Sequence, residues 1–233
     1  MSTTPNGWEV VDLDLPLLTY RYSFGPGIAS ALAVGVDGGV AIVSPPFDAA
    51  EGVYADLKPY GDVKALVASN AFHYMGLVAW KARFPNAPIY APSQSLARIE
   101  KQSKLRGIQP LAKAGSLAKH LELVEMPHYK TGELLVRITR SGRPIWYVTD
   151  VFMNLPELPP QLVFKLMFRL SNTAPGLKFN NVGAMFMVRD KRALKKWLLE
   201  QATSAPPSRV LVSHGDHFDV SPDGKELRAM FEA

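Results

Sequence analysis

Residues 64–76 read KALVASNAFHYMG, and this stretch decides the expected fold. The five residues 64–68 form a short apolar run, which predicts a buried strand. Ser69, Asn70 and His73 follow it, and helical spacing then begins over residues 74–84. Polar groups between a buried strand and a helix are where α/β folds place their binding sites. The stretch therefore predicts a strand, a site loop and a helix, in that order.

Strands and helices are also expected on both sides of this stretch. Upstream, apolar runs at 28–36 and 40–44 flank Asp37-Gly38-Gly39, a strong hairpin turn signal. Downstream, the alternation of strands and helices continues and implies α/β layering. The further strands are expected at 8–13, 17–23, 89–91, 121–126, 133–139, 144–149 and 209–213, and the further helices at 49–57, 93–104, 158–170, 191–201 and 223–231. Two sheets packed face to face, with helices outside, satisfy this order in one domain over residues 1–233.

The amino-acid composition excludes several classes of functional site. The chain has 233 residues, of which 47% are hydrophobic, as in ordinary globular proteins with a substantial core. There is no cysteine, so disulfides, thiolate metal sites and cysteine nucleophiles are excluded. Any metal ion would need histidine, aspartate or glutamate as ligands. Neither a Gly-x-Ser-x-Gly turn nor a phosphate-binding loop is found.

The charge pattern argues against nucleic acid and membrane partners. The net charge of +5 is spread along the chain, and the densest basic run, at 189–196, is interrupted by Asp190. We interpret this run as the solvated face of a helix, because it lacks the aromatic residues of a nucleic-acid surface. No apolar stretch approaches the ~20 residues of a membrane span. The N-terminus does not resemble a signal peptide, so a cytoplasmic location is expected.

Three later segments repeat the pattern of an apolar strand followed by polar residues. His128 lies in residues 127–132, Asp150 ends the segment 147–150, and His214 and His217 lie in residues 214–217. In order and context these segments, with residues 69–76, resemble the metallo-β-lactamase superfamily. In that family a His-x-His-x-Asp-His motif is followed by a Gly-His segment, a lone aspartate and a late histidine, each after a strand.

The resemblance extends from about residue 37 to His214 and implies a fold class. A segment with Trp80, Phe84-Pro85 and Ile89-Tyr90-Ala91-Pro92 is also similar to the region after the family's first motif. The implied fold is α/β, a metallo-β-lactamase-like four-layer αββα sandwich.

The first motif of the family is rewritten in this chain. Its first two histidines fall on Ser69 and Ala71, its aspartate on His73 and its last histidine on Tyr74. The ordinary site for two metal ions therefore cannot form in the usual way. Tyr74 is expected either to hydrogen-bond a substrate or to pack.

The later ligands of the family are retained as His128, Asp150 and His214. The resemblance therefore implies a single divalent ion, held by three or four of His73 and these three residues. Zinc is the expected ion, and iron or manganese would accept the same nitrogen and oxygen ligands. Such an ion lowers the pKa of bound water to ~7. This predicts a hydrolase for a small-molecule ester, lactone or thioester, with Asp150 and His214 as the catalytic residues.

Each of these residues also has an ordinary structural interpretation. Asp150 could cap a loop, His128 could be a loop residue and His73 could pack at a helix start. A non-catalytic relative that keeps the fold and has lost the metal is therefore the competing hypothesis. Asp216 and His217 are candidate partners of the ligands, in the second shell or toward a substrate, and His120 is expected at the surface.

Residues 158–170, LPPQLVFKLMFRL, are apolar nearly all round the expected helix. A core helix is the ordinary interpretation. The alternatives are a lid over the pocket, a contact in a homo-oligomer or a helix at a membrane surface. Because only Lys165 and Arg169 are basic, the membrane alternative is the weakest. We predict that this helix covers the pocket mouth or forms a subunit contact.

Overall fold

The computed structural model describes residues 2–24, 27–139 and 141–232. The chain divides into two compact units, Met1–Glu122 (unit 1) and Leu123–Ala233 (unit 2). The expectation of a single domain over residues 1–233 stays a prediction. Within the described ranges, no helix is long and apolar enough to cross a membrane.

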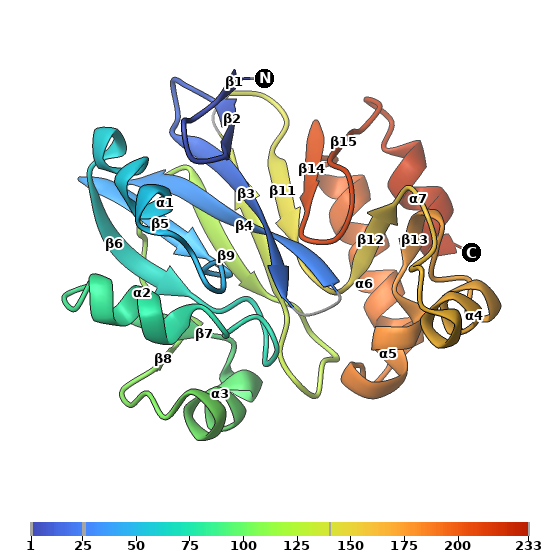
Figure 1. Cartoon of the computed structure of the whole chain (residues 1–233). Coiled ribbons are helices and arrows are strands. Elements are labelled where there is room, and N and C mark those ends of the chain that lie inside the picture. Colours follow the sequence, from blue (N-terminus) through green and yellow to red (C-terminus); the bar gives the residue numbers. More distant parts are fainter. Residues whose placement is uncertain (1, 25–26, 140, 233) are drawn as a thin grey trace. The chain divides into compact units, whose positions relative to one another are not determined.

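Unit 1 contains an eight-stranded mixed sheet whose strands follow one another in chain order (Figure 1). Strands β1 to β5 pair antiparallel, and β5 to β8 pair parallel. The strands are β1 Ser2–Thr3, β2 Trp8–Asp12, β3 Leu17–Phe24, β4 Gly27–Val36, β5 Gly39–Val43, β6 Asp62–Val67, β7 Ile89–Ala91 and β8 Gln109–Pro110. The parallel half begins with the predicted strand 64–68, which lies within β6 except for its last residue.

The predicted hairpin joins β4 and β5. Val36 pairs with Gly39, and Gly38 has the positive φ of 78° that such a tight turn requires. A side chain on Gly39 would place its Cβ 2.0 Å from the carbonyl oxygen of Asp62, the first residue of β6. Glycine at position 39 therefore lets β6 pair with β5 directly after the turn.

Helices pack on the unit 1 sheet through a buried core that includes Leu66, Leu77, Trp80 and Ile99. The helices are α1 Glu51–Ala55, α2 Leu77–Arg83 and α3 Leu96–Ser103, with 3-10 turns at Lys58–Tyr60, Ser93–Ser95 and Leu111–Lys113. The Trp80 ring lies 4.7 Å from the Tyr54 ring, centroid to centroid. The family-like segment around Trp80 therefore forms part of this core.

Asp56, next to α1, holds the start of the chain against this unit. Its carboxylate accepts hydrogen bonds from the Thr4 hydroxyl and from the Asn6 backbone and side chain. Burial acts to raise the pKa of Asp56, but these hydrogen bonds to Thr4 and Asn6 outweigh it and leave the pKa below its usual value.

Unit 2 is built on a five-stranded sheet of order β15-β14-β11-β10-β9. Strands β11 and β14 pair parallel, whereas β10 with β11 and β14 with β15 pair antiparallel. The strands are β9 Leu121–Glu125, β10 Leu134–Ile138, β11 Ile145–Val148, β14 Arg209–Val212 and β15 Phe218–Asp219, beside a separate antiparallel pair, β12 Phe152–Leu155 and β13 Gly176–Phe179. The parallel pair brings the carboxyl ends of β11 and β14 to one edge of the sheet.

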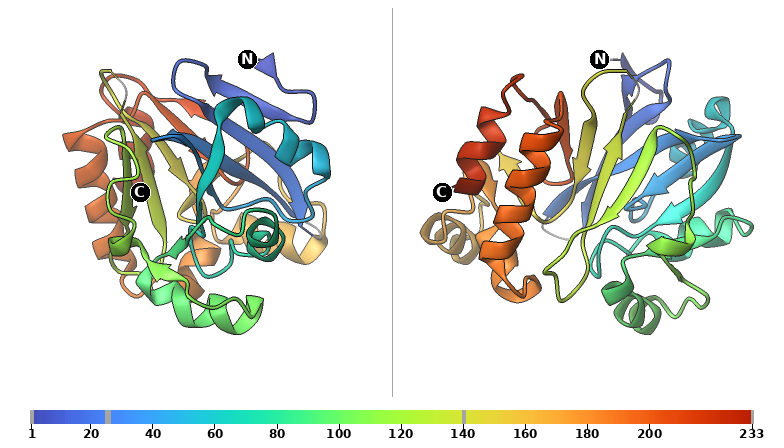
Figure 2. Two further views of the ribbon diagram at one scale, coloured as in Figure 1. Left: turned by 90° about the vertical axis from the view of Figure 1, so that its left-hand side faces the viewer. Right: turned by 180° about the vertical axis from the view of Figure 1, so that it is seen from behind.

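Four helices belong to unit 2: α4 Leu162–Leu170, α5 Asn181–Met187, α6 Lys191–Ser204 and α7 Lys225–Glu232. Helices α6 and α7 lie side by side (Figure 2). Leu194 and Leu198 of α6 and Leu227 of α7 share one buried core with Trp146 of β11. The predicted amphipathic helix 191–201 and the predicted closing helix 223–231 are thus confirmed, with small shifts at their ends.

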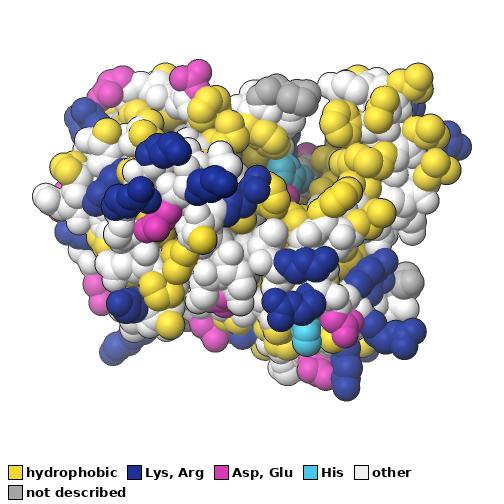
Figure 3. Space-filling model, turned by 90° about the horizontal axis from the view of Figure 1, so that it is seen from below, with side chains coloured by type: hydrophobic (Ala, Val, Ile, Leu, Met, Phe, Trp, Pro, Cys, Tyr) yellow, Lys and Arg dark blue, Asp and Glu magenta, His cyan; other side chains and the backbone are white. Residues whose placement is uncertain are grey.

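Helix α4 overturns the interpretation of residues 158–170 as a core helix. None of its residues is buried. Leu162, Val163 and Leu170 are each at least three-quarters exposed, and Met185 and Phe186 of α5 are exposed as well. Figure 3 shows hydrophobic side chains gathered on its right-hand side, over α4 and α5. The predicted role as a lid or as a subunit contact stays a prediction.

Candidate metal centre

The loop after β6 in unit 1 is organised by Asn70. This side chain is fully buried, and its Oδ1 accepts hydrogen bonds from the backbone N–H groups of Phe72 (2.8 Å) and His73 (3.0 Å). The two bonds close the loop immediately after the strand and fix the backbone that carries His73. His73 itself is buried, with 8% of its surface exposed. The sequence indicated His73 as a candidate ligand but gave no signal for the role of Asn70.

Packing closes the two positions, 69 and 71, that the resemblance assigns to the family's first two histidines. Ser69 is fully buried, and its hydroxyl lies 2.8 Å from that of Ser44, which follows β5. Ala71 is also buried. Tyr74 is partly buried against the unit 1 core, in agreement with the packing alternative.

In unit 2, parallel pairing brings Asp150 and His214 together. Val148 of β11 pairs with Val212 of β14, and each site residue lies two positions beyond its strand's last residue. The His214 Nε2 atom lies 3.1 Å from the Asp150 Oδ1 atom, and the two side chains are only 13% and 14% exposed, respectively. An imidazole nitrogen and a carboxylate oxygen are ligand types that zinc, iron and manganese accept. The predicted proximity of Asp150 and His214 is therefore observed.

A second carboxylate, which is fully buried, lies next to the backbone that carries Asp150. Glu133 precedes β10, and its Oε1 accepts a hydrogen bond from the Thr149 hydroxyl. The Asp150 backbone N–H also points to this oxygen at 3.5 Å. Burial raises the pKa of the neighbouring Tyr129 well above its usual value, and the charges of Glu133 and Asp150 raise it further. Tyr129 therefore keeps its proton at neutral pH.

Asn180 connects Asp150 to helix α5. Its Nδ2 donates to the Asp150 carbonyl oxygen at 2.8 Å, and its Oδ1 caps α5 by accepting from the Gly183 N–H at 2.8 Å. The Asn180 backbone N–H donates to the Val151 carbonyl at 3.0 Å. One buried side chain thus fixes both the helix start and the backbone at Asp150.

The loop after His214 is held mainly through its backbone. The His217 Nδ1 accepts from the Val212 N–H at 3.2 Å, which leaves the proton of a neutral ring on Nε2. The exposed Asp216 forms backbone hydrogen bonds with Asn154. The roles of Asp216 and His217 as outer partners of a metal ligand stay predictions.

The two remaining histidines occupy different surroundings. His128 is exposed, with a φ of 65°, and its carbonyl accepts from the Arg189 N–H at 2.6 Å. Among the described side chains that could share one ion, the structure does not bring His128 to Asp150 and His214. His120, expected at the surface, is half-buried with its Nε2 atom 2.8 Å from the Gly35 carbonyl oxygen.

Comparison with known proteins identifies the fold. No family model matches the chain, and no curated protein matches it. Among solved structures, a metallo-β-lactamase from Pontibacter korlensis superposes with a TM-score of 0.63 at 13% identity, over 97% of this chain and 99% of that one. The FIM-1 metallo-β-lactamase from Pseudomonas aeruginosa, in its mono-zinc form, gives a TM-score of 0.59 at 15% identity, over 99% and 95% of the two chains. A metallo-β-lactamase from Erythrobacter litoralis gives 0.60 at 13% identity, over 100% and 94%.

The chain therefore has the metallo-β-lactamase fold, an α/β fold, as the order of its four polar segments implied. Because the sequence identities are so low, this likeness establishes the fold alone.

Proposed function

We propose that the protein is a hydrolase that depends on a single divalent metal ion. The observation that carries the proposal is the nearly buried pair of Asp150 and His214 at the ends of two parallel strands. His73 is the proposed third protein ligand because the family resemblance assigns it to a ligand position. Three protein ligands with one open position are typical of catalytic zinc. The mono-zinc form of the FIM-1 metallo-β-lactamase supports the proposal, because it is a protein of this fold with a single zinc ion.

The protein's own groups would prepare this centre for chemistry. When bound, a divalent ion supplies Lewis acidity, which lowers the pKa of water to about 7. Asp150 offsets the charge of the ion, and Glu133 with Thr149 holds the strand end that carries Asp150. Tyr129 remains a neutral neighbour, because its raised pKa keeps the hydroxyl protonated. The proposed substrates are small esters, lactones or thioesters.

A non-catalytic binding protein is the second candidate. The closed packing of Ser69 and Ala71 favours it, because the places of two family ligands are filled by small buried side chains. Without a metal, the His214 Nε2 and Asp150 Oδ1 atoms lie 3.1 Å apart, within hydrogen-bonding distance of each other.

Metal stoichiometry separates the two candidates. Untagged protein would be incubated in turn with zinc, iron and manganese, and analysed by native mass spectrometry. We expect one equivalent in the wild type, none in Asp150→Ala and weakened binding in His73→Ala. His73→Asp should retain the ion, because aspartate is the family's ligand at that position.

The controls use side chains of the same types outside the proposed centre. Asp219→Ala removes an exposed carboxylate that pairs with Arg209 in the same sheet, and His120→Ala removes a half-buried imidazole. Both should bind one equivalent. Absence of metal from the wild type with all three ions would overturn the hydrolase proposal and leave the binding protein.

A further inference from the structure

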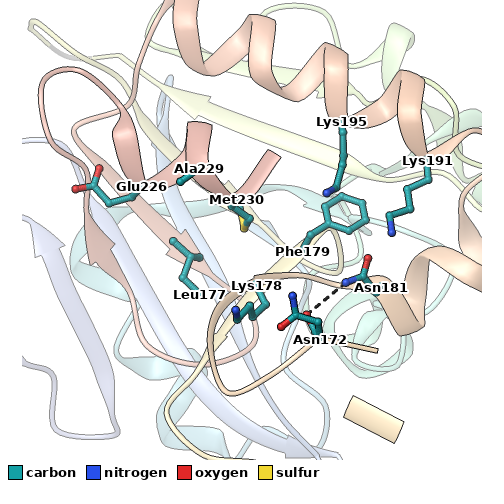
Figure 4. Close-up of a pocket in the computed structure, with 10 residues that line it drawn as sticks. All are labelled: Asn172, Leu177, Lys178, Phe179, Asn181, Lys191, Lys195, Glu226, Ala229 and Met230. Atoms are coloured by element: carbon teal, nitrogen blue, oxygen red, sulfur yellow. Dashed lines mark hydrogen bonds between the residues drawn. The ribbon is translucent and has the colours of Figure 1, made fainter. Parts of the chain in front are cut away.

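Unit 2 contains a cavity of about 390 Å³ that is separate from the proposed metal ligands. Residues from β13, α6, α7 and the segment around Asn172 line it, and three of them are lysines. Lys191 and Lys195 lie beside the Phe179 ring, whereas the amine of Lys178 points away from them (Figure 4). Ligand pockets of small molecules begin at about 300 Å³. The cavity is thus large enough for a small organic molecule.

The positive charge of this cavity is not compensated by the protein. None of the three lysines forms an ion pair with a carboxylate of the described residues. The Nζ atoms of Lys191 and Lys195 lie 5.7 and 5.2 Å from the centre of the Phe179 ring, which holds both cations near each other. Burial lowers the pKa of Lys195, and the charge of Lys191 lowers it further.

The acidic residue that lines the cavity, Glu226, is engaged elsewhere. Its carboxylate accepts from the Ser221 backbone N–H at 3.1 Å and from the Ser221 hydroxyl at 2.7 Å. Figure 4 shows this carboxylate pointing away from the lysines. Glu226 therefore does not neutralise them.

The start of helix α6 adds to the positive potential. Lys191 is its first residue, Lys195 follows one turn later, and no acidic residue lies in the first turn. Cations at a helix N-terminus oppose the helix dipole and reduce stability. By contrast, Lys196 is exposed and lies 4.0 Å from Glu200. The basic run 189–196, expected to be a solvated helix face, thus includes a half-buried lysine that faces the cavity.

We propose that this cavity binds a small molecule that carries a phosphate monoester. The ammonium groups of Lys191 and Lys195 favour a dianion over a monoanion, and a phosphate monoester carries a charge of about −1.5 to −2 at pH 7. The amides of Asn172 and Asn181 supply further polar groups. Leu177 and Met230 form an apolar wall beside the lysines for the organic part of the ligand.

The probe for this proposal is phenyl phosphate, titrated calorimetrically into chelator-treated protein so that no metal contributes. Benzenesulfonate has the same ring but only one negative charge, and we expect it to bind at least about tenfold more weakly. Inorganic phosphate should compete with the probe. Asp150→Ala should bind phenyl phosphate as the wild type does, so failure of the metal proposal would leave this result unchanged.

Variants assign the binding to the cavity. Lys191→Gln and Lys195→Gln should each weaken binding by about tenfold or more, because each removes a charged hydrogen-bond donor. Lys196→Gln is the matched control and should change the affinity by less than about twofold. The proposal is overturned by equal effects of Lys195→Gln and Lys196→Gln, by equal affinities for the two aromatic anions, or by no binding at millimolar phenyl phosphate.

Discussion

Replacement of Asn180 by alanine tests whether one side chain holds both helix α5 and the backbone at Asp150. The change removes the cap of the Gly183 N–H, which costs about 1 kcal/mol and at most about 2. It also leaves the Asp150 carbonyl without its 2.8 Å donor, which costs about 1–3 kcal/mol at a largely buried position. We therefore expect the free energy of unfolding to fall by about 2–4 kcal/mol.

Urea unfolding, followed by tryptophan fluorescence, measures this loss, and the buried Trp146 contributes to that signal. With a slope of about 2 kcal/mol/M, a loss of about 3 kcal/mol lowers the midpoint by about 1.5 M. Asn180→Ser separates the two contributions, because serine caps a helix as well as asparagine does but is too short to reach the Asp150 carbonyl. Its stability should lie between those of wild type and Asn180→Ala. An alanine variant within about 0.5 kcal/mol of wild type would refute the reasoning.

Three further predictions concern other parts of the chain. The double change Phe164→Ser with Phe168→Ser should alter the oligomeric state, which light scattering measures. It should lower the free energy of unfolding by less than about 1 kcal/mol, because α4 has no buried residue. An unfolded variant would contradict this prediction. Gly215→Ala should destabilise unit 2 by at least about 1 kcal/mol in urea, because φ is +103° and the new Cβ would lie 2.0 Å from the Asn154 carbonyl oxygen. Asp56→Asn should destabilise the protein at pH 6 but much less at pH 3. The pKa of Asp56 is lower in the folded state, so its carboxylate stabilises the fold above the unfolded-state pKa of about 3.9, and this stabilisation disappears as the pH falls through the folded-state pKa. Equal losses of stability at both pH values would exclude this linkage.

The regular elements of unit 1 could be predicted closely, because their signals are local. The turn at Asp37-Gly38-Gly39 and the apolar run before Ser69 each depend on neighbouring residues alone. In unit 2 the strands β12 and β13 and the helix α5 were not expected. Residues of β12, β13 and α5 pack in the same buried core as α6 and α7, so tertiary burial rather than local periodicity determines these three elements.

The sequence indicated Asp150, His214 and His73 as candidate ligands, but it did not indicate the groups that support each of them. Glu133 stands at the start of a strand, where a charged residue is usually solvated, and only the tertiary fold buries it against Thr149. Asn70 resembles an ordinary loop residue for the same reason. Hydrogen-bond partners distant in sequence leave no local pattern from which such roles could be read.

Helix α4 is a case in which a clear sequence pattern predicts the wrong location. A helix that is apolar nearly all round is usually buried, and this rule predicts a core position for residues 158–170. The structure instead leaves Leu162 and Leu170 each 77% exposed. The pattern records that an apolar partner is favoured, but it does not distinguish the protein's own core from another surface.

The hydrogen-bonded pair of Ser44 and Ser69 has an evolutionary consequence. The family resemblance assigns Ser69 and Ala71 to the places of the first two motif histidines, and both residues are buried. Inserting an imidazole at either position would overpack a filled space at a cost of about 1–3 kcal/mol and would leave the Ser44 hydroxyl to find another partner. A change to histidine at either position would therefore pass through a destabilised protein. The surrounding packing disfavours histidine at positions 69 and 71, whereas position 73 can exchange one ligating residue for another without such overpacking.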